Sequence, residues 1–504
     1  FMRSIKIPYS YPVRIAHALA ILSFFGLIIT GLRLAWLKED QYSEEVFELV
    51  GALTPTGNIY QLHILSGILL IAAAVFYLIY IFMTRESRRL FDLFSFHQYS
   101  SIKKIIYLLS FFVSLVSIFT GVTIYSGLYT GSEGYLFNSL LHHWCFRLLS
   151  IFIILHIIET LVSRKTAIGE IFFQKLDENF LNKKVLIVSA LIPLVVVIAA
   201  IQFFNASEIL YCEKQNRVVI VDGRENDIEW YGIDSIQVRT FGGANFQSSV
   251  AEATIKTFHN KQNIYFLIKW ADPTRSFNRQ LIKTDSGWVR EVSQYKNIYG
   301  ENIYSEDKLG LYFGREDNCA SICHIGSGHK LGLHYTDNDT ADIWQWMAVS
   351  TNPADEADDR WWGGYDNDIY GGQHFENKAS GGYKSNLNDD WHQPYFLPIN
   401  IISRNWIWYG SNSYGFYKEE NDTFPIGYRV PAVLVAPTLG DRGDVTASGK
   451  WRNGYWTVEL SRKISTGSDY DTPFRGELYL GIALFDNADI KHTYHLKPIK
   501  LVIK

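Results

Sequence analysis

The chain has 504 residues and a formal charge of -4 at pH 7. This length allows two or three domains, and the nearly balanced charge gives no indication of nucleic-acid binding. Apolar residues concentrate in the first 204 positions, whereas the remainder is rich in Asp, Asn, Gly, Trp and Tyr.

Five apolar runs occupy the first part of the chain. They lie at about 13–36, 60–83, 105–128, 141–163 and 185–204. Each has about 20 residues or more, the length needed to cross a hydrocarbon core of about 30 Å as an α-helix. The first run is long and lacks a small-residue cleavage pattern, so we interpret it as an uncleaved anchor. The sequence thus predicts a bundle of five transmembrane helices.

The connections between these runs differ in charge. Arg and Lys are frequent before the first run, between the second and third, and between the fourth and fifth, whereas the other two connections share one basic residue. By the positive-inside rule the N-terminus is cytoplasmic. Five crossings then place the residues after 204 in the periplasm, so we expect a protein of the bacterial cytoplasmic (inner) membrane.

Four histidines in the predicted helices form two pairs by depth. His142 and His156 lie on one helix face, about 21 Å apart along the axis, whereas His143 lies on a different face from His156. In an alternating up-and-down order of helices, His63 reaches the outer depth of His142, and His17 the inner depth of His156. Each pair can hold one haem between its imidazoles, because bundles build cofactor sites from side chains on facing helices.

These histidines lie in the segments RIAHALAILSFFGLIITGLRL, YQLHILSGILL and LHHWCFRLLSIFIILHIIE. The segments resemble the two-haem cytochrome b subunits of respiratory formate dehydrogenases and nickel-iron hydrogenases, over residues 1 to about 175. The resemblance implies two b haems held by the first, second and fourth helices. It also implies a membrane quinone site near His17 and His156, and a multi-subunit complex in which the chain could act as a quinone or quinol oxidoreductase subunit.

Short strand-like runs follow the last apolar helix. RVVIVDG, NIYFLIKW, LGLYFG, WTVELSR and ELYLGIALFDNA have alternating or continuous apolar patterns and are separated by Gly, Asn and Asp. They predict an all-β, sandwich-type domain. We therefore divide the chain into a transmembrane di-haem domain at 1–204, a linker at 205–216 and a periplasmic β-sandwich at 217–504. An acidic run in the sandwich, NPADEADDRWWGGYDNDIYGG, lacks the spacing of a known calcium loop and is interpreted as solvated surface.

The segment DNCASICHIGSGH contains Cys319 and Cys323, followed directly by His324. Its spacing is one residue longer than the C-x-x-C-H pattern of c-type haem attachment, so a small disulfide loop and a metal site also remain open. Periplasmic placement allows both haem attachment and disulfides, and zinc is disfavoured because no second ligand pair lies nearby. A sixth iron ligand could be Met347, whose thioether suits a haem of raised potential. The alternatives are His329, His334, His492 and His495.

A second resemblance covers most of residues 215–504. VDGRENDIEW, IYFLIKWADPTRS, CASICH, ADIWQWMA and GYWTVELSRKI look like the haem-binding domain family of the ethylbenzene dehydrogenase γ subunit. The cysteine pair resembles the branch with covalent haem, which favours a c haem at Cys319 and Cys323 with His324 on the iron. Cys145 fits helix packing, and Cys212 has no evident role.

We therefore expect a membrane-bound b/c-type cytochrome with two b haems and one c haem. It would pass electrons between the quinone pool and a periplasmic redox enzyme or cytochrome. The direction of flow stays open, because haem potentials depend on burial and on contacts around the ligands. The alternative is a ligand-binding β-sandwich displayed on a membrane anchor, without haem in the outer domain.

Overall fold

The structure is a computed structural model. The described residues are 11–36, 52–55, 59–84, 101–126, 131–163, 183–205, 208–225, 228–246, 250–292, 304–315, 336, 340–366, 371–375, 380–399, 405–410, 413–417 and 422–504. The chain forms two compact units. One comprises Phe1–Tyr129 and Leu136–Ala206, and the other comprises Thr130–Tyr135 and Ser207–Lys504.

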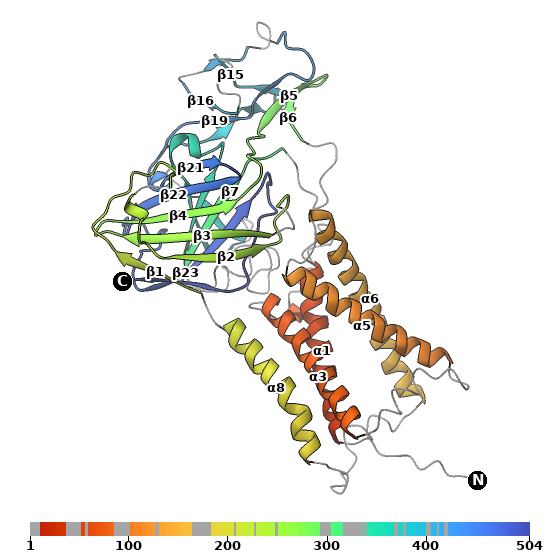
Figure 1. Ribbon diagram of the computed structural model, residues 1–504. Helices are drawn as coiled ribbons and strands as arrows, with labels where there is room; N and C mark the ends of the chain where they lie inside the picture. Colours follow the sequence, from red (N-terminus) through yellow and green to blue (C-terminus); the bar gives the residue numbers. More distant parts are fainter. Residues whose placement is uncertain are drawn as a thin grey trace, which may run out of the picture. The chain divides into compact units, whose positions relative to one another are not determined.

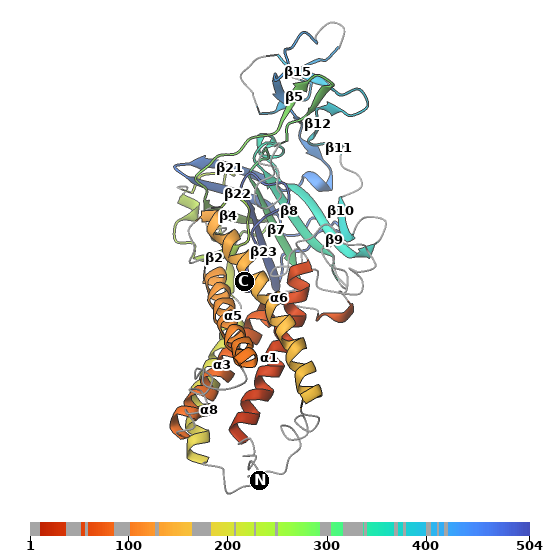
Figure 2. The same ribbon diagram turned by 90° about the vertical axis from the view of Figure 1, so that its right-hand side faces the viewer.

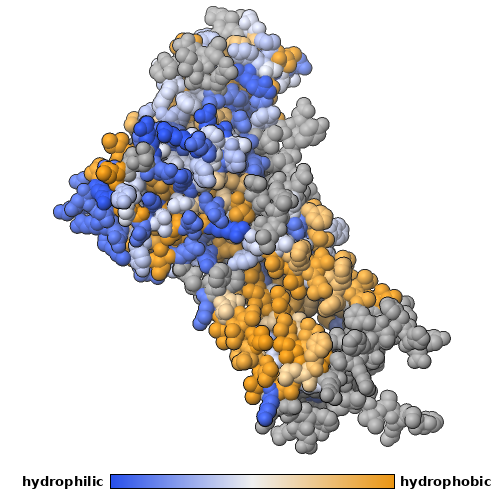
Figure 3. All heavy atoms as spheres, viewed as in Figure 1, coloured by the Kyte–Doolittle hydropathy of each residue, from blue (hydrophilic) through white to orange (hydrophobic). Residues whose placement is uncertain are grey.

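Five long helices make up the first unit (Figure 1). They are α1 (Tyr11–Trp36), α3 (Ile59–Thr84), α5 (Ser101–Ser126), α6 (Gly131–Ser163) and α8 (Lys183–Asn205). Each contains an apolar span long enough to cross a membrane, which confirms the five predicted helices. Large apolar side chains such as Phe25, Phe112 and Ile187 are exposed on them, and the helical part is mostly orange in Figure 3. Such a surface needs lipid around it, so the chain is an integral membrane protein.

Helices α1 and α3 approach each other closely at Gly26. A Cβ atom on Gly26 would lie 2.5 Å from Oγ of Ser66, so a larger residue would push the helices apart. Small residues serve this purpose in membrane helices, because they let two backbones pack directly. The close approach brings the later turns of α1 against the start of α3.

One curled sheet of twelve strands forms most of the second unit. Its order is β10–β9–β8–β7–β23–β24–β1–β3–β4–β22–β21, with β2 paired to β3. In Figure 2 the neighbours β7, β8, β9 and β10 lie side by side. Strand β1 is parallel to β24 and β3, and the other neighbours are antiparallel. The bounds are β1 (Glu208–Lys214), β2 (Ser235–Phe241), β3 (Val250–His259), β4 (Asn263–Ala271), β7 (Lys308–Gly314), β8 (Ala341–Met347), β9 (Asp358–Asp366), β10 (Gly371–Phe375), β21 (Thr446–Arg452), β22 (Tyr455–Lys463), β23 (Glu477–Phe485) and β24 (Ile499–Ile503).

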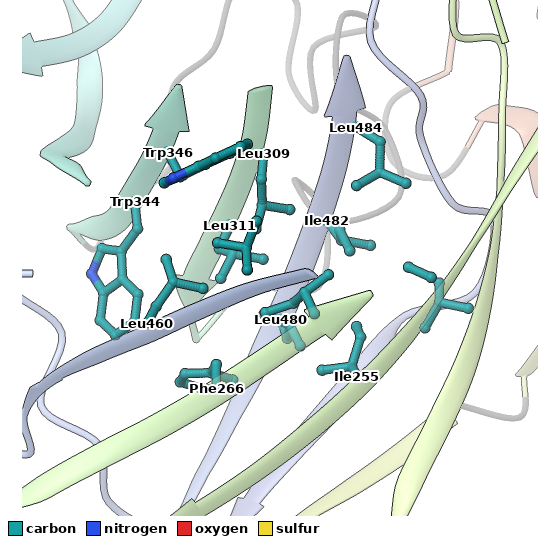
Figure 4. Packing of buried hydrophobic residues seen from close by; sticks show 14 of the residues in the cluster. Ile255, Phe266, Leu309, Leu311, Trp344, Trp346, Leu460, Leu480, Ile482 and Leu484 are labelled. Atoms are coloured by element: carbon teal, nitrogen blue, oxygen red, sulfur yellow. The ribbon is translucent and has the colours of Figure 1, made fainter. Parts of the chain in front are cut away.

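The two halves of this sheet enclose one apolar core. Phe266 of β4 contacts Phe313 of β7 and Trp344 of β8, with ring centroids 5.2 and 5.8 Å apart. Figure 4 shows Phe266 and Trp344 together with leucines of β7, β22 and β23 in this core. Alternating apolar residues therefore produce the predicted sandwich-type domain, because each strand turns one face inward.

The predicted linker at 205–216 is wrong for most of its length. Residues Glu208–Lys214 form β1, which pairs with β24 through residues 208–212 and with β3 through residues 213 and 214. This strand joins the two halves of the sheet, and its Leu210 and Cys212 are buried in the core. Only residues 206 and 207 separate it from the end of α8.

A smaller set of short strands lies outside this sheet, around two further cores, one with Leu281, Trp288, Phe416 and Val430 and one with Val349, Val433 and Val435. These strands are β5 (Gln280–Thr284), β6 (Gly287–Arg290), β11 (Ser380–Gly381), β12 (Lys384–Ser385), β13 (Leu387–Asn388), β14 (Gln393–Pro394), β15 (Phe396–Pro398), β16 (Ile407–Trp408), β17 (Ser413–Gly415), β18 (Arg429–Pro431), β19 (Val433–Val435) and β20 (Thr438–Leu439). The 3-10 helices are η2 (Ile228–Trp230), η4 (Asn352–Ala354) and η5 (Asp441–Gly443).

Candidate functional site

The structure brings His63 of α3 and His142 of α6 together. Their ring centroids are 6.2 Å apart and the ring planes are inclined by 78°. His143, the neighbour of His142, packs edge-on against Phe146. Residue 142 therefore faces His63, as expected from its position on the helix.

The hydrogen bonds of Thr30 determine which nitrogen of His63 carries the proton. Thr30 Oγ1 lies 2.5 Å from the carbonyl oxygen of Gly26, to which it donates its hydrogen. The same oxygen lies 2.9 Å from Nδ1 of His63, so it accepts from an Nδ1–H group. Nε2 of His63 is therefore the unprotonated nitrogen, which is the form that a metal requires.

His142 has the same tautomer for a parallel reason. Its Nδ1 lies 3.0 Å from the carbonyl oxygen of Ser117, which can only accept, so Nδ1 carries the proton. Thr120 adds a hydroxyl 3.0 Å from Nδ1, and this hydroxyl donates to the Val116 carbonyl at 2.8 Å. In both histidines Nε2 is thus the unprotonated nitrogen.

Space around the two rings is created by glycine. A Cβ atom on Gly121 of α5 would lie 3.2 Å from Cε1 of His142, and one on Gly31 of α1 would lie 3.5 Å from Cε1 of His63. The first distance is tighter than ordinary packing, so a side chain at residue 121 would displace the His142 ring. Glycine therefore allows the ring to lie close to the backbone of α5.

The pair fits a shared metal ion such as haem iron. Histidine binds a metal through a bond of about 2.0–2.1 Å, so two rings that share one metal ion must have their centroids within about 6.5 Å of each other. The observed distance is 6.2 Å. Backbone carbonyls and hydroxyls on the other ring nitrogen are usual partners of metal-bound histidine.

The second histidine pair involves α1 and the later part of α6. His17 and His156 lie within range of mutual electrostatic interaction. The His156 ring stacks on Phe152, with centroids 5.9 Å apart and planes inclined by 15°. The two ends of α6 thus each bring one histidine towards a histidine of another helix.

The proposed c-haem motif lies outside the described residues. This holds for Cys319, Cys323 and His324, and also for His329 and His334. Met347 is at the end of β8, buried to 3% exposure and opposite Lys308 in the strand register. Its backbone N–H donates to Oγ1 of Thr351 at 2.9 Å, so the position of the backbone at residue 347 is well defined.

The remaining candidates for the sixth ligand are two buried histidines between β23 and β24. Nδ1 of His492 donates to the Thr493 carbonyl and Nδ1 of His495 to the Lys497 carbonyl, at 2.7 and 2.6 Å. Burial lowers the pKa of each histidine to about 4, so both are neutral at pH 7. Nε2 of His495 is buried and has no hydrogen-bond partner among the described residues, which makes it a second candidate beside Met347.

Cys212 has a packing role in the core of the β domain. Its side chain is fully buried in the core, and burial raises the pKa of its thiol to about 12. A thiol of this kind stays protonated and does not react as a thiolate. Cys145 is buried in α6, in agreement with a packing role.

The sequence did not indicate the groups that orient the histidines. Ser and Thr are common in membrane helices, where they bond to their own backbone, and nothing in the order of residues singles out Thr30 or Thr120. What identifies the two threonines is their short distance to the histidines of neighbouring helices, and this distance is known only once the helices are packed.

Comparisons with known proteins agree with this division. Residues 8–168 match the family of prokaryotic cytochrome b561, which indicates a membrane b-type cytochrome that carries haem b and takes part in electron transfer. No curated protein matches the chain.

Solved structures of a family 9 carbohydrate-binding module from Caldicellulosiruptor kristjanssonii are similar to the β part. The complex with glucose is 10% identical with a TM-score of 0.25, and the complex with cellotriose is 12% identical with a TM-score of 0.24. Both matches cover 59% of this chain, and 96% and 95% of those chains. Scores this low carry no weight for fold or ligand.

The ethylbenzene dehydrogenase family matches residues 227–497, which is more than half of the chain. This match covers nearly the whole β-sandwich and agrees with the resemblance found in its sequence. The chain therefore belongs to the ethylbenzene dehydrogenase family, with a part similar to prokaryotic cytochrome b561 before the family domain.

Proposed function

We propose that this protein passes electrons between the membrane quinone pool and a periplasmic redox partner, through two b haems and one c haem. His63 and His142 would hold one b haem, and His17 and His156 the other. Cys319 and Cys323 would attach the c haem, with His324 as one ligand and Met347 as the other. Haem supplies reversible one-electron chemistry, and the protein sets its ligands and surroundings.

One observation carries the proposal. His63 and His142 come from different helices, their ring centroids are 6.2 Å apart, and both have Nδ1 bonded so that Nε2 is the unprotonated nitrogen, the form that binds a metal. A transporter that used these histidines as a proton relay would not need both rings in the same tautomer. The neighbouring hydroxyls also fix the planes of the rings, which limits reorganisation when the charge of the site changes.

The distribution of basic residues supports one orientation of the chain in the membrane. The positive-inside rule puts the start of α1 at the cytoplasmic face, so His17 and His156 would lie on the cytoplasmic side and His63 and His142 on the periplasmic side. Quinone would then react near the inner pair. The partner outside would be a redox enzyme or a cytochrome, and co-purification of a larger complex would identify it.

Rapid mixing of the purified, oxidised protein with a soluble quinol analogue tests the proposal. We expect b-haem absorbance to change first and c-haem absorbance to follow. His17→Ala should slow reduction by quinol at least about 10-fold, while dithionite still reduces the remaining haems. A wild-type rate in this variant would contradict the quinone site, and the absence of a c-haem signal would favour a ligand-binding sandwich on a membrane anchor.

A further inference from the structure

Three buried aspartates meet where three strands of the sandwich begin or end. Asp272 follows β4, Asp307 precedes β7 and Asp486 follows β23. Their exposed fractions are 0%, 0% and 4%. One carboxylate oxygen of each lies within 4.8 Å of the others, so the fold brings together residues from both halves of the sheet.

Backbone and side-chain donors hold these carboxylates in place. Asp307 accepts from the N–H groups of Ser276 and Asn487 and from the indole of Trp456, at 2.7 to 3.0 Å. Thr274 donates to Oδ1 of Asp272 through its N–H at 3.0 Å. Oδ2 of Asp272 has no donor among the described residues, although this side chain has no exposed surface.

Positive charge is missing from this cluster. In the described part of the chain, none of the three aspartates forms an ion pair with Lys, Arg or His. Buried carboxylates are normally paired or bound to a metal, because an uncompensated charge in the interior is costly.

A second acidic cluster in the same domain shows how the fold compensates such charge. Arg462 lies 2.6 Å from Asp342, 3.2 Å from Asp359 and 3.5 Å from Asp471, and it is fully buried with them. The guanidinium group supplies the cation between these carboxylates. No described side chain does the same for Asp272, Asp307 and Asp486.

We propose that Asp272, Asp307 and Asp486 bind one Ca²⁺ ion, which ties the ends of β4, β7 and β23 together. The ligand set consists of oxygen, which suits a hard cation and disfavours metals that need His or Cys. Oxygens bound to one Ca²⁺ at about 2.3–2.6 Å can be as far apart as about 5 Å, and the three carboxylate oxygens lie within 4.8 Å of one another. The unpartnered Oδ2 of Asp272 gains a partner when the ion is bound.

Metal content and thermal unfolding of the full-length protein in detergent test this site. Protein treated with EGTA is dialysed, divided, and supplied with CaCl₂, MgCl₂ or neither. We expect one retained Ca²⁺ per chain, and a Tm of the β domain about 5 °C higher at Ca²⁺ 100-fold above its Kd than without it. Equal Tm values with no retained ion would show that the cluster holds protons, and a gain with Mg²⁺ alone would contradict the choice of Ca²⁺.

Matched variants locate the ion. Asp486→Asn should lose the retained Ca²⁺ and the Tm gain, whereas Asp471→Asn, in the cluster around Arg462, should keep both. Loss in Asp471→Asn with retention in Asp486→Asn would overturn the assignment. If Asp486→Asn fails to fold, the wild-type stoichiometry and the Tm difference still decide whether an ion binds, and Asp272→Asn serves as the second variant at the site.

Discussion

The rings of His63 and His142 lie with their centroids 6.2 Å apart, although the residues are 79 positions apart in sequence and belong to different helices. Thr30 on one side and Ser117 with Thr120 on the other bond to their Nδ1 atoms. Each of the two histidine rings is therefore oriented by residues of a neighbouring helix. Variants of these individual residues should therefore differ in haem retention and in reduction potential.

The histidine pair predicts a difference between neighbouring residues. His142→Ala should remove one b haem, so that b-haem absorbance per chain falls by about half. His143→Ala should keep both b haems, because its ring packs on Phe146 and not on His63. Reduced-minus-oxidised spectra of the two purified variants provide the measurement, and the opposite pattern would show that His143 is the ligand.

The two threonines should affect the site unequally. Thr30→Val removes the hydroxyl that accepts from Nδ1 of His63, whereas after Thr120→Val the Ser117 carbonyl still accepts from His142. We expect Thr30→Val to raise the reduction potential of this haem and to weaken haem retention about 10- to 100-fold, because the ligand becomes less basic. Thr120→Val should change both quantities less. Redox titration monitored in the α band measures the potentials, and equal effects would argue against the assigned roles.

The sixth ligand of the c haem can be decided between Met347 and His495. Met347→Leu keeps the volume of this buried side chain, so the domain should fold at a cost of less than about 1.5 kcal/mol. If Met347 binds iron, the variant keeps its covalent haem but shows a lower c-haem potential, since a thioether raises it. His495→Phe should then leave that potential nearly unchanged. A shift in His495→Phe alone would assign the ligand to His495, whose Nε2 is buried without a described partner.

The cluster around Arg462 predicts a pH dependence of stability. Asp444 is close enough to Asp359 to share a hydrogen bond, and burial raises its pKa to about 6. A carboxyl whose pKa is higher in the folded state stabilises fully below its unfolded pKa of about 4, and this contribution is lost as the pH rises through 6. Asp444→Asn should therefore flatten the fall of Tm between about pH 4 and 6.5, whereas Asp390→Asn, an exposed control, should not. Parallel Tm profiles of wild type and Asp444→Asn would contradict the shared proton.

The transmembrane helices were predictable because the bilayer dictates both their length and their apolar surface. The histidine pairs were predicted from depth along the helices, and helix periodicity separated His142 from His143. Strand β1 was missed because its partners, β24 and β3, lie far away in sequence, so the short run EILYCEK had no local sign of pairing. Register between distant strands depends on packing that a single segment does not encode.

The acidic run at 352–372 was wrongly interpreted as solvated surface. Glu356, Asp358 and Asp359 are buried. Arg442 of η5 pairs with Asp358, Arg462 of β22 pairs with Asp359, and Thr438 donates to Glu356. The cluster of Asp272, Asp307 and Asp486 could not be predicted either, because its members are separated by up to 214 residues in the sequence. Local sequence therefore identifies elements and helix faces, whereas charge compensation appears only when the fold is complete.

The central claim is that one chain carries two b haems and one c haem. Pyridine haemochrome analysis of the purified protein, combined with haem staining after denaturing electrophoresis, measures both types directly. We expect b and c haem in a ratio near two to one, with the stain remaining on the chain because thioether bonds survive denaturation. Haem b alone, with no stain on the denatured chain, would contradict the c-haem site, and a single b haem per chain would contradict the two histidine pairs.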